Sequence, residues 1–428
     1  MNRLAALAAA AGLLGAGPAA AEVLAVVDAR LPGPTGAPGP PVTIVVDAGR
    51  IRSVGPGPAP AGARVLDAGG RLVTTGLMNG ATHLGLVEVD AAQETVDAAA
   101  DHTPLGAAFD VAPAVNANST LLPLARADGL TRAASYPSGA DVAPFTGQAA
   151  VLRLSEGPEI VDRPRAAVVA EVGGFSTRRA GGSRAAQWQL LRNALAEAKR
   201  YRPLPPEAPP GGPRDQLLNR LDLEALQPVL AGRIPLVVQA SRESDIREAV
   251  RLRTEYGVRV VVLGGAEAWR LAPELAAAEV AVILDPFDVL PFTFDKLGAR
   301  LDNAAILDRA GVRIAFSVSG IHLSHNAGAA LREAAGLAVA NGLPWDHALR
   351  AVTSGPAEIW GVADHYGAVA PGMDADLVVW DGDPFEPASR PTAVLVQGRQ
   401  VSLRTRQSAL AERYAPAKRD DAWPAPYR

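Results

Sequence analysis

Six histidines carry most of the chemistry open to this 428-residue chain, because it contains no cysteine. They are His83, His102, His322, His325, His347 and His365. A neutral imidazole is a common ligand of zinc, and a zinc ion needs about three or four protein ligands. The spacing of His322 and His325 can place both rings on one side of a helix start. These residues are therefore the first candidates for a metal site.

Two interpretations of the histidines remain open. His83 follows one predicted strand, whereas His322 and His325 follow another, so the three can meet at one edge of a sheet. A relocated metal site would combine them, with His102 joining from a loop. Alternatively, they are loop histidines that bond to backbone or water, with His83 packed at its strand end, because no ligand spacing here is diagnostic.

Carboxylates also lie near the predicted ends of strands. The candidates for substrate-binding or rim positions are Glu88, Glu171 and Asp285. Each could act as a general base or anchor a substrate. Surface carboxylates are common, so none of the three defines a reaction alone.

The composition and the missing motifs exclude several classes of protein. Without cysteine there is no disulfide, zinc–thiolate site, iron–sulfur cluster or cysteine nucleophile. The chain has no Gly-x-Ser-x-Gly elbow, P-loop, dinucleotide fingerprint or His-Glu-x-x-His sequence. The net charge is −4 and there is no basic block, so we expect no nucleic-acid partner.

Residues 1–21 are typical of a secretory signal peptide. Arg3 precedes an apolar run over residues 4–14, and Ala19-Ala20-Ala21 fits an A-x-A cleavage site. We therefore expect cleavage after Ala21 and a periplasmic or secreted protein. The apolar run is shorter than the ~20 residues that a membrane-spanning helix needs, so no membrane insertion is expected.

The predicted elements divide the rest of the chain into a strand-rich front, an α/β middle, a strand-rich back and a surface tail. The predicted boundaries are 22–75, 76–366, 367–407 and 408–428.

The middle part alternates helices with strands. Three times a predicted helix ends at a glycine that precedes an apolar strand, at Gly129, Gly257 and Gly311. Continuously apolar strands such as residues 280–284 indicate a parallel sheet that helices cover on both faces. This pattern leaves a closed barrel and an open doubly wound sheet as alternatives.

Three stretches resemble the amidohydrolase superfamily, and within it the imidazolonepropionase-like and dihydroorotase-like hydrolases. They are Gly70–Leu84, Ala351–Gly361 and Gly367–Asp381, of which the last, with Ala375-Asp376-Leu377-Val378-Val379, is the most specific. The last stretch is a packing motif of the family's small domain. The resemblance implies an α/β fold: a (β/α)8 TIM-type barrel inserted into a small β-sandwich domain built from both chain ends. The site would lie at the C-terminal ends of the strands.

The same resemblance implies that most metal ligands of the family are replaced here. The two strand-one histidines fall at Ala81 and His83, and only the second is kept. The strand-five and strand-six histidines fall at Gln239 and Gly264, and the strand-eight aspartate, which is also the general base, falls at Ser319. We therefore expect the standard metal site of the family to be absent.

Two functions follow as hypotheses. The first is an exported, non-catalytic barrel without a metal cofactor, which binds a small-molecule ligand or a related amidohydrolase subunit and forms homo-oligomers. The alternative is a hydrolase of non-peptide C–N bonds that uses zinc or another divalent metal in an altered or relocated site. Glu171 is the nearest candidate for the strand-four ligand of such a site.

Overall fold

The computed structural model describes residues 23–100, 103–139, 144–174, 176–202, 217–318 and 327–414. The expected signal peptide, His102, Ser319, His322 and His325 lie outside the described residues.

An eight-stranded, barrel-like sheet forms the larger part of the molecule, with the strand order β13-β12-β11-β10-β9-β8-β7-β6. Its strands are β6 (Leu77–Thr82), β7 (Leu130–Ser135), β8 (Phe145–Arg153), β9 (Val161–Glu171), β10 (Leu236–Ala240), β11 (Val260–Gly264), β12 (Ala281–Leu284) and β13 (Ile314–Phe316). The mixed α/β fold and the near closure of this sheet agree with the expected amidohydrolase barrel.

The two outer strands of this sheet, β6 and β13, approach each other through Asn79 and Gly80. The buried Asn79 side chain accepts a hydrogen bond from Val318 N and donates to Val318 O and Ala327 O, all at 3.4 Å. A Cβ atom at Gly80 would lie 2.7 Å from Phe316 O. The hydrogen bonds of the Asn79 amide and the absence of a side chain at Gly80 thus allow the first and last strands of the sheet to come close together.

The expected (β/α)8 pattern is wrong at the third strand. β8 runs antiparallel to both of its neighbours, β7 and β9. Residues 154–160 join β8 to β9 without a helix. That connection is shorter than the crossover of about a dozen residues that parallel strands require, so it can only form a hairpin. The outer face of β8 therefore has no covering helix of its own.

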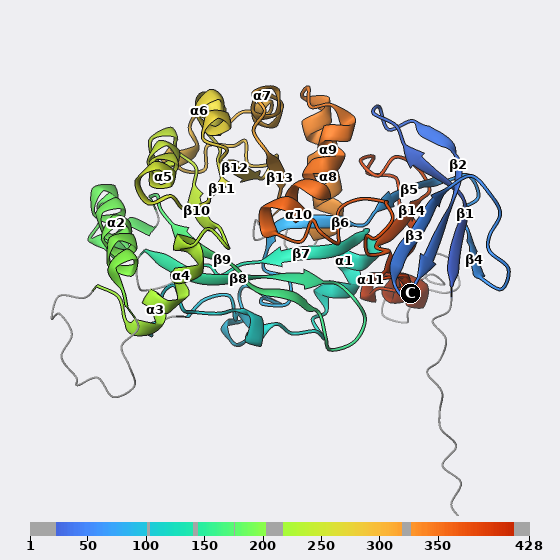
Figure 1. The fold of residues 1–428 in the computed structure, drawn as a ribbon, viewed down its shortest axis with the longest axis horizontal. Helices are drawn as coiled ribbons and strands as arrows, with labels where there is room; N and C mark the ends of the chain where they lie inside the picture. Colours follow the sequence, from blue (N-terminus) through green and yellow to red (C-terminus); the bar gives the residue numbers. More distant parts are fainter. Residues whose placement is uncertain are drawn as a thin grey trace, which may run out of the picture.

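Helices cover most of the outer face of the barrel sheet (Figure 1). They are α1 (Leu121–Ala127), α2 (Arg184–Arg200), α3 (Arg220–Ala225), α4 (Gln227–Leu230), α5 (Glu243–Tyr256), α6 (Ala272–Ala277), α7 (Asn303–Arg309), α8 (Ala327–Ala340) and α9 (Trp345–Ala351). The next helix, α10 (Ser354–Trp360), instead packs with the apolar side chains of the inner face. Short 3-10 turns occur at Gln93–Thr95, Ala112–Ala114, Ser176–Ala180, Ala268–Leu271 and Phe294–Lys296.

The three predicted helix–glycine–strand units are confirmed. Gly129, Gly257 and Gly311 follow α1, α5 and α7 with φ values of 94°, 71° and 81°. This left-handed conformation ends a helix at little cost only when the residue lacks a Cβ atom.

Two apolar cores lie on the two faces of the barrel sheet. The outer core packs strand residues such as Val238 against the helices. The inner core takes side chains from all eight strands, among them Met78 and Ala81 of β6, and adds Trp360 from α10. Because side chains alternate between faces along a strand, each strand contributes to both cores.

Strands from both ends of the chain form a second sheet, with the order β16-β15-β14-β5-β1-β2-β3, and β4 pairs with β1. The strands are β1 (Leu24–Pro32), β2 (Pro38–Asp47), β3 (Arg50–Gly55), β4 (Arg64–Asp67), β5 (Leu72–Thr75), β14 (Leu377–Trp380), β15 (Pro391–Val396) and β16 (Arg399–Gln400). They are hydrogen-bonded as one continuous sheet, so the expected β-sandwich is not confirmed.

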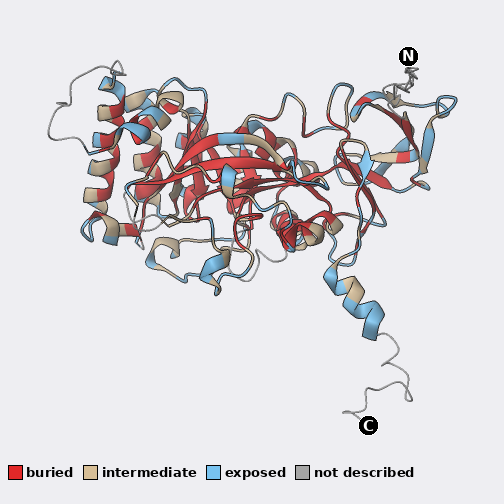
Figure 2. Cartoon of the chain, turned by 90° about the horizontal axis from the view of Figure 1, so that it is seen from below, coloured by how far each residue is buried: buried red, intermediate tan, exposed pale blue. Residues whose placement is uncertain are grey.

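The last helix, α11 (Arg406–Tyr414), has no buried residue and projects from the body of the molecule (Figure 2). Within the described ranges, no helix is both long enough and apolar enough to span a bilayer.

Candidate functional site

A cavity of about 390 Å³ opens at the C-terminal ends of β9, β10, β11 and β12. We call it the mouth cavity. Four of the residues singled out from the sequence line it: Glu171, Gln239, Gly264 and Asp285. The strand register explains their meeting, because Gln239 pairs with Glu171 on one side and with Leu263 on the other. Asp285 directly follows β12, whose Leu284 pairs with Gly264.

The carboxylates around the mouth cavity are already engaged by cations or backbone amides. Glu171 accepts a hydrogen bond from Arg179 Nη1 at 2.9 Å. Asp285 Oδ1 accepts one from Phe287 N at 2.9 Å.

The two remaining carboxylates belong to the segment between β12 and α7. Asp288 forms an ion pair with Lys296 at 2.7 Å. Asp295 accepts hydrogen bonds from Gly174 N and from Arg184, which ties this segment to the loop after β9. These pairs fix the wall of the cavity in place.

Three uncharged polar side chains of the mouth cavity, unlike its carboxylates, are not engaged by other parts of the described chain. The side chains of Gln239, Ser241 and Ser317 line the cavity and make no side-chain hydrogen bond with the described residues. A glutamine amide and a hydroxyl both donate and accept. The cavity therefore offers neutral groups of both kinds to a ligand.

His83 lies beside the mouth cavity rather than in its wall. Its ring packs against that of Tyr136, a cavity residue, with the ring centroids 4.7 Å apart. Its Nε2 atom is shielded from solvent and has no hydrogen-bond partner among the described residues. Burial, opposed in part by the charge of Asp90, lowers the pKa of His83 from 6.5 to about 4. The imidazole is therefore neutral at pH 7.

Acidification below pH 6.5 is expected to destabilise the chain through His83. Between pH 6.5 and pH 4 the unfolded chain binds a proton at this ring and the folded chain does not, so the free energy of unfolding falls as the pH falls. At pH 4.5 the loss reaches about 2–3 kcal/mol for a shift of this size. Urea unfolding at pH 7.5 and pH 4.5 measures it, with His83→Gln as the comparison.

The pH dependence of His83→Gln should be weaker than that of the unchanged chain by this amount. Equal pH dependence of the two proteins would contradict the assigned protonation state. Observing the His83 ring in an NMR titration supplies an independent check, because its midpoint should lie near pH 4.

Glu88 does not line the mouth cavity. Its carboxylate accepts hydrogen bonds from Thr120 N and Thr120 Oγ1, at 3.1 and 3.0 Å, and from Asn116 at 3.4 Å. Thr120 immediately precedes α1, so Glu88 stabilises the start of that helix.

Sequence reasoning missed Tyr136, Ser241 and Lys296, which also line the mouth cavity. Ser241 could have been found, because it lies two residues after Gln239 at the end of the same strand. Nothing in the sequence pattern indicates that Lys296 comes back to this cavity.

The described residues do not fit a zinc ion. No group of three or more His, Cys, Asp or Glu side chains within the described part of the chain is arranged to hold a metal. Ala81 is fully buried in the inner core. Gly264 has no donor and adopts a φ of 99°. Of the four family ligand positions that the structure describes, occupied by Ala81, His83, Gln239 and Gly264, His83 therefore has the one side chain that is a common zinc ligand.

The sequence itself matches a known family over part of its length. Residues 241–403 match the model of the amidohydrolase family. A stretch of 57 residues is 42% identical to an amidohydrolase from Hapsidospora irregularis. That match covers 13% of this chain and only 6% of the relative's length.

Solved structures with this fold include an amidohydrolase from Thermotoga maritima, with a TM-score of 0.79 and 23% identity over 89% of this chain and 100% of that chain. A prolidase in complex with N-methylphosphonate-L-proline has a TM-score of 0.54 and 18% identity, over 89% and 99% of the two chains. An N-isopropylammelide isopropylaminohydrolase from Burkholderia multivorans has a TM-score of 0.51 and 17% identity, over 89% of this chain and 98% of that chain. The family match and the shared fold together support the amidohydrolase superfamily for this chain.

Proposed function

We propose that this chain is an exported amidohydrolase-fold protein that binds a small polar molecule in the mouth cavity without a metal. The proposal rests on a difference between the charged and the uncharged residues that line the cavity. The carboxylates make ion pairs or accept backbone hydrogen bonds, whereas Gln239, Ser241 and Ser317 keep their side-chain groups available. The export rests on the signal-like residues 1–21.

The ligand class follows from these three side chains. A buried polar group gains most from a partner that matches both its donor and its acceptor atoms. A small neutral amide or cyclic amide presents an N–H group beside a C=O group, and so complements Gln239 and the two hydroxyls. A cavity of about 390 Å³ is within the range of small-molecule sites.

The lining also argues against nucleophilic catalysis by serine. A serine hydroxyl needs a base within hydrogen-bond reach to attack a carbonyl near pH 7. The described histidine beside the cavity, His83, makes no hydrogen bond through Nε2 to either serine. We therefore assign Ser241 and Ser317 to binding.

The alternative function is hydrolysis of a non-peptide C–N bond at an altered metal site. The observation that favours it is the shielded Nε2 atom of His83, which has no partner among the described residues, since an unpaired buried polar atom is costly unless something binds it. The other ligands would have to come from residues outside the described part of the chain, such as His322 and His325.

Binding of a cyclic amide without metal is the test of the proposal. Residues 22–428 are exported to a periplasm, purified without chelator and analysed for metal by mass spectrometry. We expect no stoichiometric metal, and binding of hydantoin, followed by NMR, that is the same with EDTA and with added zinc. Gln239→Leu should weaken that binding about tenfold, which is the value of a hydrogen bond of about 1.4 kcal/mol.

The outcomes separate the two functions. One metal per chain that is lost in His83→Ala would overturn the metal-free proposal and favour the hydrolase. Hydantoin binding that requires zinc would do the same. No binding, or equal binding by Gln239→Leu, would remove the mouth cavity as an amide site. Ser183→Ala, a change near the cavity but outside its lining, is the matched control.

A further inference from the structure

A second, larger cavity lies on the outer side of the barrel, away from the mouth. Its volume is about 650 Å³, and it lies between β8 and the start of β9 on one side and α3 and α4 on the other. We call it the outer pocket. It exists because β8 is antiparallel: the hairpin to β9 carries no helix, so short elements cover this part of the sheet incompletely.

The outer pocket has an apolar lining. The apolar side chains belong to a loop before β7, to the helices α3 and α4, and to the segment between α4 and β10: Leu105, Ala108, Leu221, Ala225, Pro228 and Ile234. Leu221 is 49% exposed. Covering such a surface with the apolar part of a ligand is favourable by about 25 cal/mol per Å².

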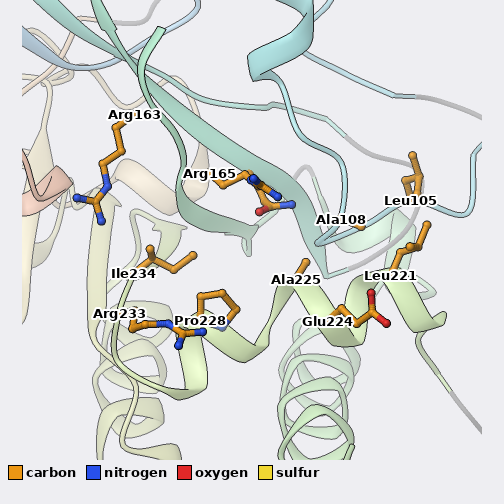
Figure 3. Close-up of a pocket in the computed structure, with 11 residues that line it drawn as sticks. Leu105, Ala108, Arg163, Arg165, Leu221, Glu224, Ala225, Pro228, Arg233 and Ile234 are labelled. Carbon is orange, nitrogen blue, oxygen red and sulfur yellow. The ribbon is translucent and has the colours of Figure 1, made fainter. Parts of the chain in front are cut away.

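Three arginines border this lining (Figure 3). Arg163 and Arg233 lie on one side of the pocket, Leu221 and Glu224 lie on the other, and Arg165 projects from the strand between them. Arg163 Nη1 donates to Gly361 O at 2.5 Å.

The other two arginines are held loosely or not at all. Arg165 has a long ion pair with Asp110, at 3.7 Å. Arg233 is exposed and makes no side-chain hydrogen bond or ion pair with any part of the chain that the structure describes. Glu224, the acid of the lining, is engaged by Tyr201, whose hydroxyl donates to it at 3.2 Å, and by Arg220 at 3.9 Å.

The backbone at Arg165 adds an independent observation. Arg165 has a φ of 49°, in the left-handed region, although it lies within β9 and has a Cβ atom. The β8–β9 register shifts between Ala149 and Val151, beside this residue. Such a conformation costs about 1–3 kcal/mol and is concentrated at functional sites. Here it directs an arginine to the edge of the pocket.

The electrostatic surroundings are positive beyond the lining itself. Arg259, at the start of β11, lies close to Arg163. Burial first, and then the like charges of Arg163 and Arg313, lower the pKa of Arg259. On the side of the pocket where Arg163 and Arg233 lie, opposite Glu224, an anion would therefore meet a positive charge.

We propose that the outer pocket binds an amphipathic organic carboxylate. The carboxylate would lie between Arg165 and Arg233, which are able to form charge-assisted hydrogen bonds, and the apolar body would cover the lining by Leu221 and Ile234. The site is separate from the mouth cavity, because Arg163 and Arg165 lie at the start of β9 whereas Glu171 lies at its end.

The test uses octanoate as the probe and isothermal titration of the full mature chain, residues 22–428. We expect octanoate to bind, and acetate and octylammonium to bind at least tenfold more weakly, because the first lacks the apolar body and the second carries the wrong charge. The double variant Arg165→Ala/Arg233→Ala should lose octanoate affinity at least tenfold. Arg52→Ala should not change it, because this exposed arginine of β3 lies in the second sheet and makes no side-chain hydrogen bond or ion pair with the described residues.

Three results would overturn the proposal. The first is no octanoate binding by the unchanged chain at about 10 mM octanoate, a concentration at which even a Kd of about 1 mM would be detected. The second is octylammonium binding as strong as that of octanoate. The third is an unchanged octanoate affinity in the double variant. Leu221→Asp is a second variant on an exposed helix position. It should reduce octanoate binding while circular dichroism confirms that the fold persists.

Discussion

Replacing Arg132 with methionine is expected to lower the free energy of unfolding by about 3–5 kcal/mol, the size of effect that follows when one partner of a buried ion pair is removed. Arg132 lies in β7 and is fully buried. Its guanidinium donates to three carboxylates: from Nε to Asp376 at 2.8 Å, from Nη1 to Asp162 at 2.5 Å and from Nη2 to Asp374 at 2.6 Å.

The expected loss comes from the carboxylates that would remain. Asp374 and Asp376 are themselves buried, and without the guanidinium they would lose the cation that they share. Asp162 would keep its ion pair with Arg153, whereas the one cation left to Asp374 among the described residues would be Arg50, at 3.8 Å. Burial opposes the charge of Arg132, but Asp376 and Asp162 outweigh it and raise the pKa of the guanidinium. Methionine fills a similar volume, so the measured change reports the lost charge rather than a cavity.

Urea unfolding, followed by circular dichroism, measures the difference. Arg247→Met is the matched control, because Arg247 also bonds to two carboxylates, those of Glu243 and Glu274, but at the surface. It should cost less than about 1 kcal/mol. Arg132→Lys should fall between the two, since one ammonium cannot reach three carboxylates. Equal losses in Arg132→Met and Arg247→Met would refute the argument.

The Arg132 cluster also explains why the stretch Gly367–Asp381 was the most specific resemblance in the sequence. Two of its residues, Asp374 and Asp376, are the buried partners of Arg132, which lies more than two hundred positions earlier. Asp376 also accepts a hydrogen bond from Gln397 N at 2.8 Å. The motif thus joins the barrel sheet to the second sheet. It is a packing motif, as expected, and it contains no group of the mouth cavity.

The parallel arrangement of most barrel strands was predicted from the sequence, whereas the antiparallel direction of β8 was not. The helix–glycine–strand units indicated the parallel sheet, and the family resemblance assigned Gln239 and Gly264 to the positions of the strand-five and strand-six histidines. The two residues are found at the ends of neighbouring strands. β8 is buried at every residue but its last, and this pattern does not depend on the direction in which the strand runs. The informative signal was the connection over residues 154–160, with Gly157 and Pro158, which is too short for a parallel crossover.

The sequence assigns Ala81 and Gly264 to ligand positions of the family by residue type, but the backbone conformation and the packing at these positions could not be predicted from it. Gly264 adopts a φ of 99°, and a Cβ atom there would lie 3.1 Å from Ser241 Oγ. A histidine at this position would be strained. Ala81 is enclosed in the inner core. A ligating side chain would therefore strain the backbone at Gly264 and would have to displace core side chains at Ala81.

Trp360 is the second position at which a large effect is expected, because it joins the inner core to the strand that carries His83. Its side chain is 1% exposed and packs among inner-core residues such as Met78. Its indole Nε1 donates to Gly80 O, in β6, at 2.8 Å. β6 has a hydrogen-bonded strand neighbour on one side only, so this bond supports a strand that the sheet secures incompletely.

Trp360→Ala should lower the free energy of unfolding by about 3–5 kcal/mol, through lost burial and the cavity left behind. Trp360→Phe keeps much of the ring and removes the donor, which leaves Gly80 O unsatisfied and should cost about 1–3 kcal/mol. Trp269→Ala is the control, since Trp269 is only half-buried and lies between Arg270 and Arg300 at the protein surface.

Urea unfolding ranks the three variants by their free energies of unfolding. If Trp269→Ala costs as much as Trp360→Ala, the packing of Trp360 against β6 does not have the importance for stability that we assign to it. If instead Trp360→Phe also moves the NMR signal of the His83 ring, then the packing below β6 positions the histidine beside the mouth cavity.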